Sequence, residues 1–179
     1  MGRSEELADA LQQEDASRIL GLARLKPGPV VRFLSGRLCS ADAGEKWRAV
    51  RAIGVIIREP GLLPDPKIED LLQRFLWALN DESGAVPFGI PEAIGEILAG
   101  RPAFRPRVVP LLCGMLTEHE TVQSGPIERG VYWAIGRIGA DVAQYCPDVA
   151  RVIADAAAGH PDPETRETAA QTLEAITCP

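Results

Sequence analysis

Apolar residues recur at spacings of three and four along most of this chain, which is the pattern of amphipathic helices. Turn-forming stretches divide the pattern into blocks, and the clearest are Lys26-Pro27-Gly28-Pro29, Glu59-Pro60-Gly61 and Pro64-Asp65-Pro66. Such stretches end helices because proline lacks a backbone N–H and glycine favours turns. From about residue 28 onward, each block consists of an outer helix, a turn and an inner helix. The sequence therefore predicts an all-α protein built from helix pairs.

A five-residue phrase, Ala-Ile-Gly-x-Ile, occurs three times and begins at Ala52, Ala93 and Ala134. The copies are 41 residues apart in both cases, and Pro106 and Pro147, at the starts of two outer helices, keep the same spacing. A fixed period of this length indicates stacked helix pairs whose apolar faces pack on their neighbours. The fourth inner helix follows the third copy by 38 residues, which predicts a turn three residues shorter.

The glycine of each copy, Gly54, Gly95 or Gly136, lies inside a predicted inner helix. A glycine at such a position costs about 1 kcal/mol relative to alanine. Because the glycine occurs three times in register, we infer that another interaction offsets its cost in stability. We expect this interaction to be a close approach of the neighbouring helix.

Local signals predict where several helices begin. Asp42 with Glu45 three residues later forms an acidic version of a capping box, and Asp162-Pro163 supplies an N-cap and a first helical residue. Pro91 predicts an inner helix that either starts late or bends, since an interior proline costs about 3 kcal/mol. Residues 4–25 predict one or two short helices, interrupted near Gln13-Glu14-Asp15, that cap the first repeat.

The inner helices resemble those of bacterial HEAT-like repeat proteins of the phycobilisome-lyase type, whose motif is approximately Val-Arg-x-x-Ala-Ala-x-Ala-Leu-Gly-x-Ile-Gly. Thr165 to Leu173 and Ala134 to Gly139 match this motif most closely. The resemblance implies a right-handed α-α superhelix, that is, a short HEAT-like or armadillo-like solenoid of about four helix pairs with an N-terminal helical cap. The implied boundaries are a cap at 1–27 and repeats at approximately 28–63, 64–103, 104–143 and 144–179, all in one structural domain.

Composition narrows the range of functions. The 179 residues carry a formal net charge of −6, which disfavours generic binding to nucleic acid or anionic lipid, because both require an excess of Lys and Arg. No apolar run approaches the ~18–20 residues that span a bilayer, and the first residues lack the order of a secretory signal. We therefore expect a cytoplasmic protein with no membrane partner.

The cysteines, Cys39, Cys113, Cys146 and Cys178, are widely separated and form no Cys-x-x-Cys pair. This spacing fits neither a zinc site nor a disulfide scaffold. We expect buried, reduced thiols that pack as small apolar side chains, with Cys178 the most exposed. The sequence also lacks a phosphate loop, a dinucleotide fingerprint and a Gly-x-Ser-x-Gly motif, and we expect no cofactor.

Aligning the inner helices by the 41-residue period places polar and aromatic residues beside the apolar phrase, where they should face outward onto a concave surface. One aligned row is Arg51, Glu92 and Trp133, and another is Val55, Glu96 and Arg137. One interpretation is purely structural, with Arg51–Glu92 and Glu96–Arg137 as inter-repeat ion pairs worth about 0–1 kcal/mol each.

The other interpretation is functional, because aromatic residues and arginine dominate binding hot spots. It predicts a non-catalytic interaction module or scaffold that binds a protein or peptide in a shallow channel floored by Gly89 and Gly130. Phe88 aligns with Trp47 and has a core position as its alternative. The predicted binding residues are Arg51, Phe88, Glu92, Glu96, Tyr132, Trp133 and Arg137.

An enzyme built on the same scaffold, either metal-dependent or nucleic-acid-processing, is the alternative function. Asp81, Glu82, Glu92 and Glu96 offer carboxylates for a divalent cation, although an ordinary helix C-cap is the favoured interpretation of the loop from Asn80 to Gly84. A diiron site is disfavoured because the single His-Glu pair, at His119, falls in a predicted turn. A basic, glycosylase-like face is disfavoured by the two inner-helix glutamates and the net charge.

Further expectations concern the partner and two side chains. Nucleic acid is an unlikely partner for the reasons above, whereas an exposed array face allows homo-oligomers. Trp77 is expected in the core rather than at a binding surface, and His160 is expected to be a solvated turn residue.

Overall fold

The computed structural model describes residues 2–80, 88–117 and 125–178. Within these ranges the chain forms ten α-helices and two short 3-10 helices and contains no strand, which confirms the all-α prediction. Asp81, Glu82 and the His119-Glu120 pair lie outside the described residues. Asn80 ends its helix as the C-cap, with its side chain donating to the backbone oxygen of Leu76 at 2.9 Å.

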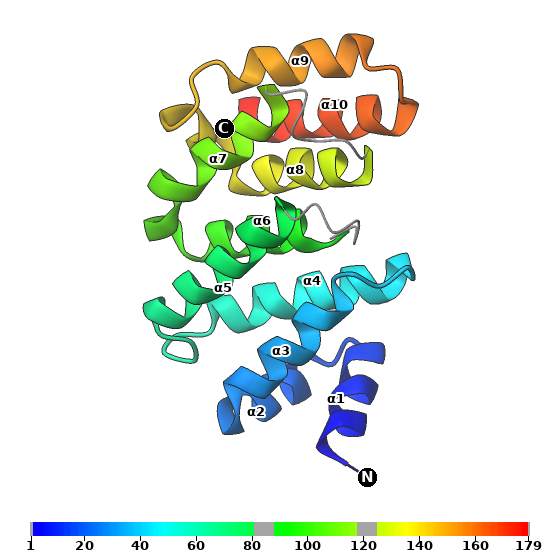
Figure 1. The fold of residues 1–179 in the computed structure, drawn as a ribbon, viewed down its shortest axis with the longest axis vertical. Helices are drawn as coiled ribbons and strands as arrows, with labels where there is room; N and C mark the ends of the chain where they lie inside the picture. Colours follow the sequence, from blue (N-terminus) through cyan, green and yellow to red (C-terminus); the bar gives the residue numbers. More distant parts are fainter. Residues whose placement is uncertain (1, 81–87, 118–124, 179) are drawn as a thin grey trace. The chain divides into compact units, whose positions relative to one another are not determined.

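The chain divides into two compact units, Met1–Gly100 and Arg101–Pro179, each of which is described by itself. The first unit contains the elements in blue to green in Figure 1, namely α1 (Arg3–Gln12), α2 (Ala16–Leu25), α3 (Pro27–Arg37), α4 (Ala43–Arg58), α5 (Asp65–Leu79) and α6 (Ile90–Gly100). The second contains η1 (Pro102–Phe104), α7 (Arg105–Thr117), α8 (Gly125–Ile138), η2 (Gly139–Gln144), α9 (Val149–Gly159) and α10 (Pro163–Thr177).

In the first unit, α3 and α4 form one outer and inner pair, and α5 and α6 form the next. The inner helices α4 and α6 pack against each other, and the repeated phrase lies in their contact. Ala52, Ile53 and Ile56 of α4 and Ala93, Ile94 and Ile97 of α6 are all buried. The phrase therefore forms the core, as the period predicts.

Several helix boundaries in this unit match their sequence signals. α1 and α2 are separated at residues 13–15, as expected for the N-terminal cap. The Asp42 carboxylate accepts the Glu45 backbone N–H at 3.0 Å, and Ser40 completes the cap by donating its hydroxyl to Glu45. Pro91 is the second residue of α6, so this inner helix starts late. Gly61 has φ +73°, a left-handed conformation that allows the turn between α4 and α5.

The second unit repeats the arrangement with α7–α8 and α9–α10. The inner helix α10 packs on both α8 and α9, and the phrase residues Ala134, Ile135 and Ile138 are buried. Asp162 is the N-cap of α10 and accepts the Thr165 backbone N–H at 3.2 Å, with Pro163 as the first helical residue. Among the residues that the structure describes, no helix is both long enough and apolar enough to span a bilayer.

Candidate functional site

Glu92 and Glu96 of α6 are buried, with only 2% and 5% of their surface exposed. The prediction that they face outward is therefore wrong. The physical reason is that α6 is enclosed on all sides, since each residue from Ile90 to Leu98 is buried. Arg51, which is solvent-exposed on α4, corresponds at the 41-residue offset to the enclosed Glu92 of α6.

Both glutamates form ion pairs with α4. Lys46 Nζ lies 2.8 Å from Glu92 Oε1, and Arg58 Nη1 lies 2.5 Å from Glu96 Oε2. Arg51 instead pairs with Glu14, at 2.9 Å, so the predicted Arg51–Glu92 pair is wrong. These contacts join residues 46 and 38 positions apart rather than 41, because packed helices cross at an angle and aligned positions do not stay opposite along their length.

Burial also shapes the protonation of Glu92. Desolvation raises the pKa of its carboxyl group above the ordinary 4.5, and Lys46 opposes this effect only in part. Glu92 Oε2 is buried and has no hydrogen-bond partner in the described part of the chain. Neither inner-helix glutamate is an open carboxylate. The described residues also contain no group of three or more side chains arranged to hold a metal ion.

The other predicted binding residues differ in exposure. Tyr132 is buried, which corrects its expected place on an open surface, and burial followed by the Glu128 charge raises the pKa of its hydroxyl. Phe88 is half-buried and Arg51 is exposed. In the second unit, half-buried Trp133 and exposed Arg137 line a recess of about 270 Å³ on α8 and α10.

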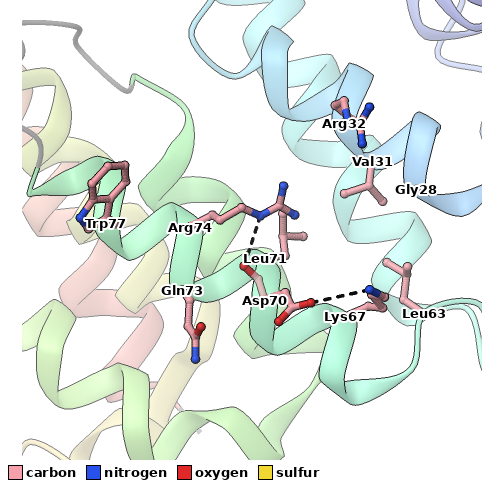
Figure 2. A pocket seen from close by; sticks show the side chains of 10 residues that line it. All are labelled: Gly28, Val31, Arg32, Leu63, Lys67, Asp70, Leu71, Gln73, Arg74 and Trp77. Carbon is pink, nitrogen blue, oxygen red and sulfur yellow. Dashed lines mark hydrogen bonds and ion pairs between the residues drawn. The ribbon is translucent and has the colours of Figure 1, made fainter.

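A larger groove, of about 740 Å³, lies between the outer helices α3 and α5 of the first unit (Figure 2). Trp77 stands at one end of it with 77% of its surface exposed, so its predicted core position is wrong. The buried stripe of α5 contains Ile68, Leu71, Leu72 and Phe75. At about 100° per residue, Trp77 lies about 200° from Phe75 and hence on the opposite side. The exposure of Trp77 was therefore predictable from the helical spacing of α5.

The floor of this groove is apolar and its edges are polar. Val31, Leu63 and Leu71 are buried beneath it. The α5 edge comprises Lys67, Asp70, Gln73, Arg74 and Trp77, and Gly28 and Arg32 belong to α3. Residues spaced by three and four share one helix face, so α3 and α5 each present one stripe to the groove.

The groove is locally basic although the chain as a whole is acidic. Arg32, Lys67 and Arg74 line it with a single carboxylate, Asp70. Lys67 Nζ lies 3.7 Å from Asp70 Oδ2, and Arg74 Nε donates to the backbone oxygen of Asp70 at 3.3 Å (Figure 2). Neither Arg32 nor Arg74 pairs with a carboxylate within the described ranges.

The sequence around α3 explains part of this charge. Between Ala16 and Ala41 there are five basic residues and no Asp or Glu. Three of the five pair with carboxylates elsewhere in the first unit, through Arg18–Asp9, Arg24–Glu59 and Arg37–Glu45. Arg32 remains available at the groove.

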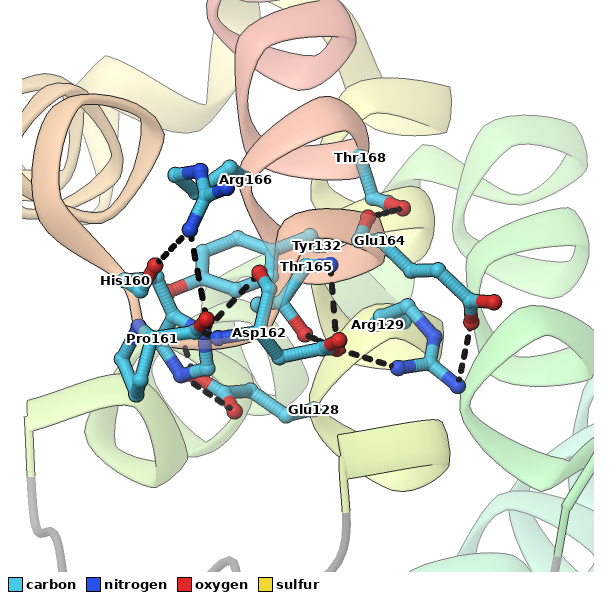
Figure 3. A network of polar contacts seen from close by, with 10 residues as sticks. All are labelled: Glu128, Arg129, Tyr132, His160, Pro161, Asp162, Glu164, Thr165, Arg166 and Thr168. Atoms are coloured by element: carbon cyan, nitrogen blue, oxygen red, sulfur yellow. Dashed lines mark hydrogen bonds and ion pairs between the residues drawn. The ribbon is translucent and has the colours of Figure 1, made fainter.

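The second unit contains a polar network around the turn between α9 and α10 (Figure 3). His160 Nε2 lies 3.3 Å from Glu128 Oε2, and the Asp162 backbone N–H donates to His160 Nδ1 at 3.1 Å. Arg166 Nη1 donates to the backbone oxygen of His160 at 2.6 Å. Arg129 bridges the Asp162 and Glu164 carboxylates. The network ties this turn to α8.

This network does not form a catalytic set. Because His160 Nδ1 accepts a backbone N–H, its Nε2 is the nitrogen that donates to Glu128, and both ring positions are occupied. The ring therefore offers no lone pair to a substrate. His160 is half-buried and hydrogen-bonded, which corrects the prediction of a solvated turn residue.

Two cysteines far apart in the sequence meet in the second unit. Cys113 of α7 and Cys146 line the same recess of about 160 Å³, and burial together with Cys146 raises the pKa of the Cys113 thiol. All four cysteines are free thiols, and Cys178 is exposed as predicted. Cys39 is exposed as well, contrary to its predicted burial. A raised pKa keeps a thiol protonated at neutral pH, and the thiolate is the nucleophilic form.

Comparison with known proteins supports the fold. No family model and no curated protein matches the chain. A designed armadillo repeat protein in complex with the peptide (KR)4 is similar in structure, with a TM-score of 0.57 and 20% identity over 90% of this chain and 69% of that one. The crystal structure of an engineered protein is similar with a TM-score of 0.53 and 20% identity, covering 90% of this chain and 66% of that one. These likenesses confirm an all-α repeat fold of the armadillo type.

Proposed function

We propose that this protein is a non-catalytic interaction module that binds a peptide segment of another protein in the groove between α3 and α5. The observation that carries the proposal is Trp77, a large aromatic side chain exposed at the edge of a groove with an apolar floor. Exposed apolar surface rimmed by polar residues marks interaction sites, and tryptophan and arginine are among the side chains most enriched in binding hot spots.

The repeat fold is consistent with this function, because stacked helix pairs build extended surfaces on which partners dock. The designed armadillo neighbour, which is in complex with the peptide (KR)4, has a fold of the same kind. The enzyme alternative lacks comparable support, since Glu92 and Glu96 are engaged by Lys46 and Arg58.

Part of the binding surface predicted from the sequence remains as a second candidate for the same function. Trp133 and Arg137 line the smaller recess of the second unit, together with Gln171. This recess is less than half the volume of the α3/α5 groove. A comparison of two tryptophan variants separates the surfaces.

The test is affinity capture from a lysate of the source organism with wild type, Trp77→Ala and Trp133→Ala, after circular dichroism has shown that all three are folded. We expect a partner that wild type and Trp133→Ala retain and that Trp77→Ala loses. Loss with Trp133→Ala alone would move the site to the second unit. Equal capture by all three proteins would overturn both assignments.

A further inference from the structure

We infer that the segment bound in the α3/α5 groove is acidic and contains an apolar anchor side chain. This inference rests on the proposed function and deepens it by naming the chemistry of the partner. Its basis is the combination of an apolar floor, an exposed tryptophan and, on both helices of one groove, a guanidinium group that forms no ion pair among the described residues.

The charges of the groove favour carboxylates. Arg32 on α3 and Arg74 on α5 stand on opposite sides of the groove (Figure 2), and no ion pair occupies either guanidinium group among the described residues. A guanidinium group binds a carboxylate through two parallel hydrogen bonds. Asp70 offsets only one of the three cations, and its contact with Lys67 is an exposed pair at 3.7 Å that a ligand carboxylate can displace.

The apolar residues favour a side chain of aliphatic or aromatic type as the anchor. Val31, Leu63 and Leu71 form a floor between the charged edges. Gly28 adds no side chain at the α3 edge, and the space beside its Cα is open. A leucine-sized group can therefore lie on this floor while Trp77 covers it from the α5 end.

The same features disfavour nucleic acid as the occupant. Binding a phosphate backbone depends on neutralising a series of phosphates, whereas the groove holds three cations and the Asp70 carboxylate. The chain's net charge of −6 also repels a polyanion at long range. A short segment that mixes acidic and apolar residues matches both parts of the groove.

The experiment measures the binding of labelled peptides to the full chain by fluorescence anisotropy. The probes are (ELD)4, its neutral counterpart (QLN)4, its basic counterpart (KLR)4 and a single-stranded oligo-dT. We expect (ELD)4 to bind at least about tenfold more tightly than (QLN)4, with no detectable binding of (KLR)4. We also expect the affinity for (ELD)4 to fall as salt is raised, because the contacts are exposed ion pairs.

Variants assign the effect to residues. Arg32→Glu with Arg74→Glu should weaken (ELD)4 at least about tenfold and leave (QLN)4 unchanged, while Trp77→Ala should weaken both peptides. Arg32→Glu and Arg74→Glu are also made singly, and Arg151→Glu is their matched control, because it makes the same charge change at an exposed position of α9 in the second unit. Circular dichroism and thermal melts confirm that each variant is folded.

The outcomes distinguish this inference from the function on which it rests. Equal binding of (ELD)4 and (QLN)4, both lost with Trp77→Ala, would overturn the acidic preference and leave the binding groove in place. Tighter binding of oligo-dT than of (ELD)4 would overturn the inference in favour of nucleic acid. Failure of every peptide, together with unchanged lysate capture by Trp77→Ala, would overturn both.

Discussion

Gly54 and Gly136 hold the same position in the repeated phrase, but the space beside them differs. A Cβ atom on Gly54 would lie 2.8 Å from the Glu96 Cδ atom and 3.0 Å from Arg58 Nη2. On Gly136 the nearest atom would be Thr172 Oγ1, at 3.4 Å, which is an ordinary contact. The close approach expected for both glycines is therefore required at Gly54 and not at Gly136.

The alanine variants of these glycines should have opposite effects. Gly54→Ala forces the buried Glu96 carboxylate away from Arg58 and should lower the free energy of unfolding by about 1–3 kcal/mol, as overpacking does. Gly136→Ala should be neutral or stabilising by up to about 1 kcal/mol, because alanine favours the helix. Urea unfolding of both variants measures the difference. Equal losses in both would show that the Glu96–Arg58 pair is not the constraint.

The buried carboxyl group of Glu92 should make stability depend on pH in a defined direction. Its pKa in the folded state is raised above 4.5, so the folded protein binds the proton at higher pH than the unfolded chain does. Its contribution to the free energy of unfolding therefore falls as pH rises from about 4.5 through the raised pKa.

Glu92→Gln removes this titration and keeps an oxygen acceptor for Lys46. The difference in unfolding free energy, wild type minus variant, should therefore decrease across that pH window and be constant outside it. Urea unfolding of both proteins in a series of buffers measures the difference, and other titrating groups cancel in the subtraction. A difference that is constant at every pH, or that rises, would contradict this assignment.

At the level of single residues, sequence patterns predicted the core better than the surface. The buried Ala and Ile positions followed directly from the 41-residue period, because apolar residues at helical spacing have one favourable environment. Glu92 was misplaced because periodicity assigns a direction to a side chain but does not reveal that a whole helix is enclosed. The large apolar side chain of Trp77 favours a core position, whereas its angular position around the helix, about 200° from Phe75, predicts exposure. The angular position was the correct guide.

Among the helices, α10 depends most clearly on its first turn. Asp162 caps α10 by accepting the backbone N–H and the hydroxyl of Thr165, at 3.2 Å and 2.6 Å, and also pairs with Arg129. The hydrogen bond from the Thr165 side chain, followed by the backbone bonds and Arg129, lowers the pKa of Asp162. A lowered folded pKa contributes stability that is present above the ordinary value of 3.8 and is lost as pH falls through the folded value.

Substitutions of Asp162 should separate the cap from the ion pair. Asp162→Ala removes both interactions and should lower the melting temperature at pH 7, whereas Asp162→Asn retains a capping oxygen and should lower it less. Both differences from wild type should shrink as pH falls and the carboxylate is protonated. Thermal melts by circular dichroism at pH 7 and pH 3 provide the measurement. An asparagine variant as unstable as the alanine variant would assign the effect to Arg129 alone.

Whole elements were predictable where a local signal determined them. Asp42, Pro91 and Asp162-Pro163 correctly predicted helix starts, because caps and proline act within one turn. The partners of Lys46 and Arg58 were not predictable from the period alone. They depend on the angle at which α4 and α6 cross, and that angle arises from side-chain packing over the whole contact.

The molecule as a whole combines a negative net charge with a basic groove in its first unit. The formal charge is −6, while Arg32, Lys67 and Arg74 outnumber Asp70 at the groove. Long-range steering follows the summed charge and contact energy follows the local groups. The proposed acidic segment would therefore be repelled at a distance and held once it is bound.

This opposition predicts how binding of (ELD)4 should respond to salt. The net charge of the protein repels the acidic peptide, and the basic groove attracts it. Because these two long-range effects offset each other, the association rate constant should stay near the unsteered range of about 10⁵–10⁶ M⁻¹ s⁻¹ and change little as salt is raised. The dissociation rate constant should increase with salt, because the ion pairs of Arg32 and Arg74 are formed only in the complex. Stopped-flow mixing that follows Trp77 emission at several ionic strengths measures both constants, with Trp77→Phe as the control for the signal. An association rate constant that falls steeply with salt would instead show that the groove's field, rather than the net charge, governs the approach of the peptide.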